Sequence, residues 1–175
     1  MIYKTLSIFI ITCICVITFG LLVSYSETIS TGNKYSKVNS VEVMLSVNVK
    51  NNSVIATLVF TNNSTNTICI DITNGCLTGN IKNNVFTINY DGTEIPYTGK
   101  LYKRRPPGAK DVVKLLPGKS ISTSVILNKV YRFSPGCHTY TVSYAAFHQF
   151  QLPDFQGLLE LKSNKVTFDY KDWEK

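Results

Sequence analysis

VEVMLSVNVK, residues 41–50, decides the fold class. Its apolar side chains occupy every second position, at Val41, Val43, Leu45, Val47 and Val49. Alternation with a period of two is typical of a strand that buries one face. The next run, SVIATLVFT at residues 53–61, has the same alternation, and only Asn51-Asn52 separates the two. The pair therefore predicts a hairpin or two neighbouring antiparallel strands.

Further extended segments follow along the chain: ICIDIT (68–73), VFTINYDGTEIPY (85–97), VVKLLPGKS (112–120), ISTSVILN (121–128), TYTVSYA (139–145) and NKVTFDY (164–170). Asp91-Gly92 predicts a hairpin and Pro117-Gly118 a turn. Beyond the N-terminal leader we find no convincing helical periodicity. The pattern predicts an all-β fold, an immunoglobulin-like antiparallel β-sandwich of about seven to nine strands, and a closed barrel is the main alternative.

The segment FHQFQLPDFQGLLELKSN, residues 147–164, precedes the last predicted strand. We interpret it as a long link whose aromatic side chains cover one end of the core, because exposed apolar patches are uncommon. The alternative is an exposed binding patch.

The first 26 residues form a hydrophobic leader. A single early charge, Lys4, precedes an uncharged apolar run from Leu6 to Val23, and Ser24 and Ser26 are small residues suited to cleavage. This order predicts an N-terminal signal helix, and the run just reaches the length at which an uncleaved membrane anchor becomes the alternative. We expect residues 27–40 to be a flexible linker and residues 41–175 to be one sandwich domain. The protein would be secreted, extracellular or periplasmic, and membrane-anchored if the leader is retained.

Three cysteines follow the leader, at Cys69, Cys76 and Cys137. In an oxidising compartment we expect a Cys69–Cys76 disulfide closing a short loop around the turn-forming Asn74-Gly75, with free buried thiols as the alternative. Cys137 would then be left to join two chains as a dimer. No pair of Cys or His has zinc-ligand spacing, so the sequence predicts no metal site.

The segment from Tyr97 to Ser120, YTGKLYKRRPPGAKDVVKLLPGKS, is called the basic segment below. It holds seven Lys/Arg against one acid, Asp111, and accounts for most of the formal net charge of +7. Its candidate binding residues are Lys103, Arg104, Arg105, Lys110, Lys114 and Lys119. Such a cluster would attract an acidic protein surface or an anionic lipid, glycan or cell wall.

Catalytic motifs are missing from the sequence. It contains no H-E-x-x-H zinc helix, no G-x-S-x-G elbow and no phosphate-binding glycine loop. Cys137 and His138 are adjacent, and neighbouring strand residues point to opposite faces, so they do not form a nucleophilic pair. We expect a non-enzymatic protein without a cofactor. Nucleic acid is not an expected partner, because an exported protein rarely meets it and the basic segment lacks alternating aromatic and basic residues.

The sequence of the basic segment and its flanks resembles that of a known family. The matching residues are Pro96-Tyr97, Gly99, Lys103-Arg104, Pro107, Asp111-Val112-Val113, Leu116 to Ser120, Val130-Tyr131 and Gly136. They resemble the non-catalytic, propeptide-like N-terminal domain of deuterolysin-type, peptidyl-Lys metalloendopeptidases. The resemblance extends in arrangement from Val41 to Tyr170 and is specific from Asp91 to Tyr144.

That resemblance has departures. GCHTY at residues 136–140 has extra residues between the glycine and the strand tyrosine, and Cys137 is not part of the family's pattern. In those enzymes a zinc-binding catalytic domain follows this domain, and the sequence printed here ends at Lys175. The resemblance therefore implies an immunoglobulin-like, propeptide-like domain alone.

Two functional hypotheses follow. The first is a secreted binding domain that acts as an inhibitor or folding partner of a metallopeptidase, because a peptidase specific for lysine presents an acidic pocket to a Lys/Arg loop. The second is a surface adhesion or structural domain whose basic loop contacts anionic lipid, glycan or cell wall.

Overall fold

The structure, a computed structural model, describes residues 41–172 apart from residues 104, 106 and 153–154. In this part the regular elements are β-strands and two short 3-10 turns, η1 (Ala109–Asp111) and η2 (Leu127–Lys129). Every pair of strands is antiparallel. The predicted all-β class is confirmed. No helix of the described residues is long and apolar enough to cross a membrane. The predicted leader and linker, residues 1–26 and 27–40, lie outside the described residues.

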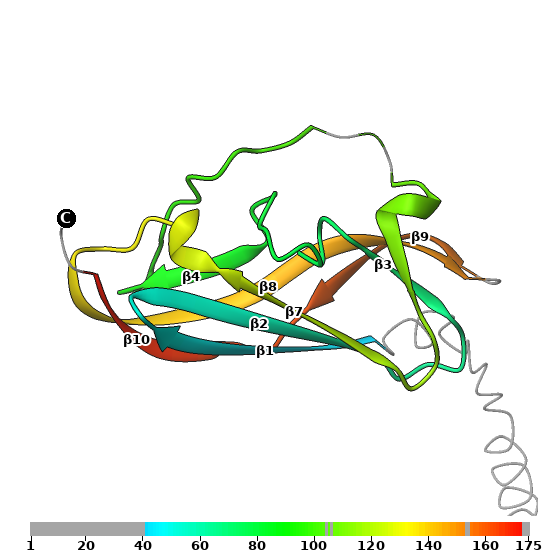
Figure 1. The fold of residues 1–175 in the computed structure, drawn as a ribbon, viewed down its shortest axis with the longest axis horizontal. Helices are drawn as coiled ribbons and strands as arrows, with labels where there is room; N and C mark the ends of the chain where they lie inside the picture. Colours follow the sequence, from blue (N-terminus) through cyan, green and yellow to red (C-terminus); the bar gives the residue numbers. More distant parts are fainter. Residues whose placement is uncertain (1–40, 104, 106, 153–154, 173–175) are drawn as a thin grey trace, which may run out of the picture. The chain divides into compact units, whose positions relative to one another are not determined.

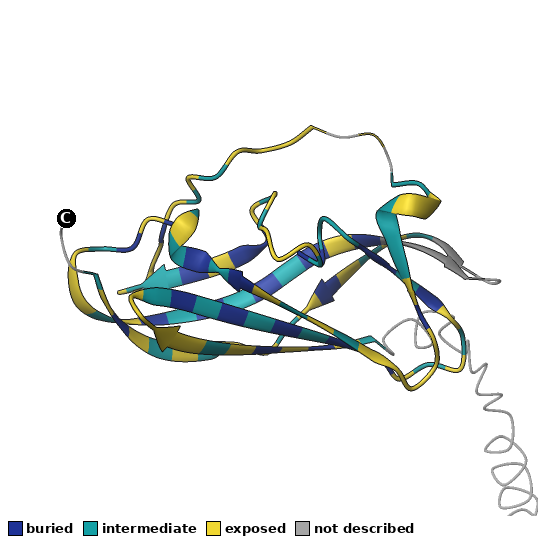
Figure 2. Ribbon diagram, viewed as in Figure 1, coloured by how far each residue is buried: buried dark blue, intermediate teal, exposed yellow. Residues whose placement is uncertain are grey.

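The first sheet has the strand order β1-β2-β7 and contains β1 (Val41–Lys50), β2 (Ser53–Asn62) and β7 (Ser120–Ile126). The β1–β2 hairpin predicted from the alternation is confirmed, with Lys50 opposite Ser53. Asn51 and Asn52 close it with φ values of 48° and 58°, and asparagine tolerates this left-handed backbone better than most residues. Along β2 every second side chain is buried, which Figure 2 shows as alternating colours.

The second sheet has the order β10-β8-β4-β5. It contains β4 (Phe86–Tyr90), β5 (Thr93–Glu94), β8 (Gly136–Leu152) and β10 (Val166–Asp172). The predicted turn at Asp91-Gly92 joins β4 to β5, and both residues have positive φ, 48° and 74°. The inward positions of β8 are buried; they are Tyr140, Val142, Tyr144, Ala146 and His148.

The link expected over residues 147–164 is wrong. β8 continues to Leu152, and β9 (Phe155–Lys162) pairs with its distal half from Ala145↔Lys162 to Leu152↔Phe155. The described residues therefore contain ten strands, β1 to β10, more than the predicted range. The physical reason is that β10 and β4 pair only with residues 136–144 of β8. The remaining residues of the strand, 145–152, pair with β9 instead.

A third, two-stranded sheet pairs β3 (Ile68–Asp71) with β6 (Val112–Leu115). β3 also lies beside β8: the backbone amide of Asp71 on β3 donates to Nδ1 of His148 on β8. In Figure 1, η1 and β6 follow the long arc of chain that leaves β5.

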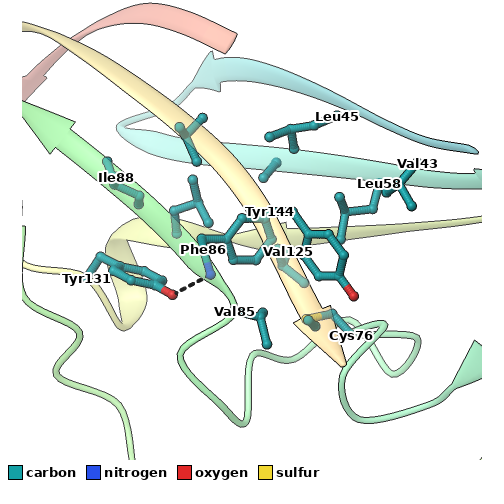
Figure 3. Close-up of a cluster of buried hydrophobic side chains, with 14 of the residues drawn as sticks. Val43, Leu45, Leu58, Cys76, Val85, Phe86, Ile88, Val125, Tyr131 and Tyr144 are labelled. Atoms are coloured by element: carbon teal, nitrogen blue, oxygen red, sulfur yellow. Dashed lines mark hydrogen bonds between the residues drawn. The ribbon is translucent and has the colours of Figure 1, made fainter. Parts of the chain in front are cut away.

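The core lies between the first two sheets. The ring of Phe60 on β2 meets that of Tyr144 on β8 edge to face, with centroids 5.8 Å apart, and Phe86 on β4 lies 5.7 Å from the same tyrosine ring. The hydroxyl of Tyr131 accepts the Phe86 amide, as Figure 3 shows. Burying one such large side chain contributes about 1.5–3 kcal/mol. Burial also raises the pKa of the Tyr131 and Tyr144 hydroxyls well above the ordinary value.

Ser163 and Asn164, after β9, link the two main sheets. The Tyr144 amide on β8 donates to Oγ of Ser163 (2.9 Å), and the Ser163 amide donates to the Tyr144 carbonyl (3.0 Å). Asn164 contacts β1 instead: its Oδ1 accepts the Leu45 amide at 2.7 Å and its Nδ2 donates to the Leu45 carbonyl at 3.0 Å. One amide side chain therefore bonds both backbone groups of a β1 residue.

Tyr140 ties the start of β8 to the chain before it. Its hydroxyl accepts the backbone amide of Ser134, six residues earlier, at 3.1 Å. The same ring packs on Phe133 with centroids 4.8 Å apart. The corner that leads into β8 is therefore held by one side chain from within the strand.

Candidate functional site: the basic segment

The N-terminal end of the basic segment is tied to the strand-like residues after η2. The Thr98 amide donates to the Val130 carbonyl at 2.7 Å, and Tyr97 forms an isolated antiparallel bridge with Tyr131. Gly99 then passes beside the Tyr97 ring so closely that a Cβ there would collide with it. The hydroxyl of Tyr97 donates to the Lys100 carbonyl at 3.2 Å. A side chain at position 99 would therefore force the Tyr97 ring to move.

Asp111 holds the C-terminal end of the stretch from Thr98 to Asp111, which is called the arc below. Its Oδ2 accepts the Gly108 amide at 2.8 Å and lies 3.0 Å from Nη2 of Arg105. Its carbonyl accepts the Ile72 amide at 2.9 Å, which attaches η1 to the segment after β3. The Gly108 hydrogen bond, and then the charge of Arg105, keep the pKa of the Asp111 carboxyl below its ordinary value. Asp111, the single acid of the segment, thus links η1 to Gly108 and Arg105.

Between these ends the described residues Lys100 to Lys103 and Arg105 are exposed. Figure 1 shows that the arc leaves the sheets after β5 and returns at η1. Lys103 and Arg105 are exposed, and so are two uncharged residues, Leu101 at 74% and Tyr102 at 55%. Sequence reasoning missed this apolar pair. It stands between Lys100 and Lys103, and an apolar pair inside a cationic run was the pattern that could have identified it.

The predicted binding residues do not form one compact cluster. Lys103, Arg105 and Lys110 are exposed on the arc and at η1, and Arg104 lies outside the described residues. Lys114 is exposed on β6, opposite Cys69 of β3. Lys119 is exposed beside the Pro117-Gly118 turn, where its carbonyl accepts the Asn62 amide. The charges therefore spread from a tethered arc onto ordered strands.

All three described cysteines are free, so the predicted Cys69–Cys76 disulfide is not formed in this structure. The alternation of β3 explains why. Ile68 and Ile70 are buried, Cys69 between them points to the opposite face, and Cys76 lies in the core. Burial raises the pKa of the Cys76 thiol to about 12, so it is a neutral thiol at physiological pH. Cys137 is exposed near the start of β8.

A buried polar network lies where β3 meets β8. The hydroxyl of Tyr144 is 2.8 Å from Nε2 of His148 and 2.9 Å from the carbonyl of Asn74. Nδ1 of His148 accepts the Asp71 amide, and the Asp71 carboxylate accepts the amides of Thr73 and Asn74, both at 2.8 Å. Both His148 and Asp71 are almost fully buried. The network joins β3 and the turn after it to β8.

Among the described residues no group of three or more His, Cys, Asp or Glu side chains is placed to hold a metal ion. The basic segment exposes six described cations that can form hydrogen bonds and ion pairs, with Leu101 and Tyr102 among them; they are Lys100, Lys103, Arg105, Lys110, Lys114 and Lys119. Neither a comparison with protein-family models nor one with curated proteins returned a match for this chain.

Proposed function

We propose that the chain is an exported, non-enzymatic immunoglobulin-like β-sandwich that binds a metallopeptidase through the basic segment, as its inhibitor or folding partner. The strand orders β1-β2-β7 and β10-β8-β4-β5 support the fold assignment, because they correspond to strands A-B-E and G-F-C-C′ of that architecture. The bond from the Ser134 amide to the Tyr140 hydroxyl has the form of a tyrosine corner, which supports it further.

The observation that carries the function is the tethering of an exposed cationic arc. Thr98 and Asp111 fix its two ends, and Pro107 restricts the backbone between them. A segment held in this way loses less conformational entropy when it enters a partner's cleft than a free loop would. A peptidase that cleaves beside lysine offers a carboxylate-lined cleft of complementary charge. The resemblance of the segment to the propeptide-like domains of such peptidases motivates the choice of partner.

The test is the initial rate at which a peptidyl-Lys metalloendopeptidase hydrolyses a lysine-containing substrate in the presence of the purified protein. We expect the rate to fall with added protein, and a K103S/K110S/K114S variant to require more protein for the same effect. This variant leaves the Arg105–Asp111 pair intact. The matched control is K129S/K165S, which removes exposed lysines outside the segment. Unchanged rates at saturating protein, together with an unchanged yield of refolded peptidase, would reject both roles.

An anionic lipid, glycan or cell-wall surface is the second candidate. The exposed lysines on the arc, on β6 and at the β7 turn favour it, since each lysine near such a surface contributes about 1 kcal/mol. Co-sedimentation with phosphatidylserine-containing vesicles, compared with neutral vesicles, tests it. Binding that disappears between low and physiological salt identifies a purely electrostatic contact, because exposed charges are screened.

We also propose that the leader is a removable signal helix. N-terminal sequencing of the exported protein tests this: cleavage after Ser26 gives Glu27 as the first residue, and an intact N-terminus identifies a membrane anchor.

A further inference from the structure

The uncharged centre of the basic segment has the features of an interface core. A single exposed leucine is ordinary on a protein surface. Leu101 and Tyr102, however, are adjacent, exposed by 74% and 55%, and flanked by lysines on a segment tied at both ends. In protein interfaces the energetically dominant residues are apolar or aromatic side chains surrounded by a polar rim.

We propose that Leu101 and Tyr102 fill apolar pockets in the partner's cleft and limit the dissociation rate, while the surrounding cations mainly accelerate association. This inference rests on the proposed function and names how the peptidase is recognised. The partner is accordingly a peptidase whose substrate cleft combines carboxylates with apolar pockets.

The different effects expected of the cations and of the apolar pair follow from how each interacts with a partner. The described cations of the segment are exposed, so their attraction acts at a distance and is screened by salt. Charges of this kind change the association rate more than the lifetime of a complex. An apolar side chain acts only once it is in contact and desolvated, so its removal appears in the dissociation rate.

The ends of the segment keep the pair presented. Gly99 packs beside the Tyr97 ring just before Leu101, and Asp111 bonds Gly108 and Arg105 at the end of the arc. These ties lie on both sides of Leu101 and Tyr102 in the chain. Neither side chain contributes to the buried core, so replacing them leaves the fold intact.

The experiment measures association and dissociation rates on an immobilised peptidyl-Lys metalloendopeptidase at low and physiological salt. The variants are L101S/Y102S and K103S/K110S/K114S, and L158S is the matched control because Leu158 is similarly exposed, at 67%, on β9. We expect L101S/Y102S to dissociate about 10- to 100-fold faster with little change in association. The triple lysine variant should associate more slowly and depend less on salt, and L158S should bind like the wild type.

Each other outcome overturns a distinct statement. If the wild-type protein binds and L101S/Y102S dissociates equally slowly, the inference fails and the proposed function stands. If the wild-type protein does not bind the peptidase, the proposed function fails and the inference falls with it. If the wild-type protein binds phosphatidylserine vesicles at physiological salt and L101S/Y102S does not, the pair enters lipid, and the cleft is rejected.

Discussion

Replacing Tyr144 with Phe is expected to destabilise the fold by about 2–4 kcal/mol, which is large for the loss of one oxygen atom. The rings of Phe60 and Phe86 would keep their contacts, with centroids 5.8 Å and 5.7 Å from the Tyr144 ring. Only the hydroxyl is lost, together with its contacts to Nε2 of His148 at 2.8 Å and the Asn74 carbonyl at 2.9 Å.

The magnitude follows from which atom donates. Nδ1 of His148 accepts the Asp71 amide, so in the neutral ring the proton is on Nε2 and is donated to the Tyr144 oxygen. The Tyr144 hydroxyl in turn donates to the Asn74 carbonyl. A phenyl ring would remove the acceptor of this buried N–H and the hydroxyl that donates to the Asn74 carbonyl. An unsatisfied buried group costs about 1–3 kcal/mol, and the sum is reduced because Phe carries no hydroxyl that must itself be desolvated.

Urea unfolding of the wild type and of Tyr144→Phe measures this loss, provided that the m-value is unchanged. The matched control is Tyr140→Phe, which removes a hydroxyl that accepts the half-buried Ser134 amide and donates to the Ser134 carbonyl at 3.4 Å. Water can replace it at this half-buried residue, so we expect a loss of about 1 kcal/mol or less. A loss from Tyr144→Phe no larger than that of Tyr140→Phe would refute the reasoning. Coupling between Tyr144→Phe and His148→Leu in a double-mutant cycle would locate the effect in the shared hydrogen bond.

Three further predictions concern single side chains. The Cys76 pKa is raised from 9.0 to about 12, so its stabilisation is complete well below pH 9 and is lost as pH rises toward 12. Between pH 9 and the ordinary tyrosine pKa of 10.0 the free energy of unfolding should fall by about 1 kcal/mol, and urea unfolding over this range should show a flatter dependence for Cys76→Ala. The Asp111 pKa is lowered from 3.8, so the contacts of its carboxylate with Gly108 and Arg105 are present above that pH and are lost as pH falls through the lower value. Asp111→Asn should therefore speed trypsin cleavage of the basic segment at neutral pH without changing global stability. Equal cleavage rates would contradict this role of Asp111. Exposed Cys137 should form a covalent dimer seen on non-reducing electrophoresis and absent from Cys137→Ser, and a monomeric wild type under oxidising conditions would reject it.

The β1–β2 and β4–β5 hairpins could be predicted from the sequence because residues close together in the chain determine them. The alternation from Val41 to Phe60 sets the inward face of β1 and β2, and Asn51-Asn52 and Asp91-Gly92 supply the positive φ that two-residue hairpins require. The same period could also have excluded the disulfide, since Cys69 stands between two inward isoleucines.

The missing parts depend on contacts between distant residues. β9 was missed because its residues, such as the run Leu158-Leu159, lack a clean alternation, and its strand character arises only from pairing with the extension of β8. His148 and Tyr144 form their network with Asp71 and Asn74, which are about seventy residues away in the chain. In the basic segment, charge indicated the site, but the exposure of Leu101 and Tyr102 depends on where the two ends are tied.

Asn164 has a consequence for the protein in a crowded solution. β1 is the outermost strand of its sheet, and a row of unbonded backbone groups along such a strand invites another chain to pair with it. The Asn164 side chain bonds both the amide and the carbonyl of Leu45, and the neighbouring Ser163 forms a parallel bridge with Val43, so these two residues take the place of a further strand along part of β1. We expect a second molecule to pair less readily with this part of the edge, because its backbone groups are already bonded.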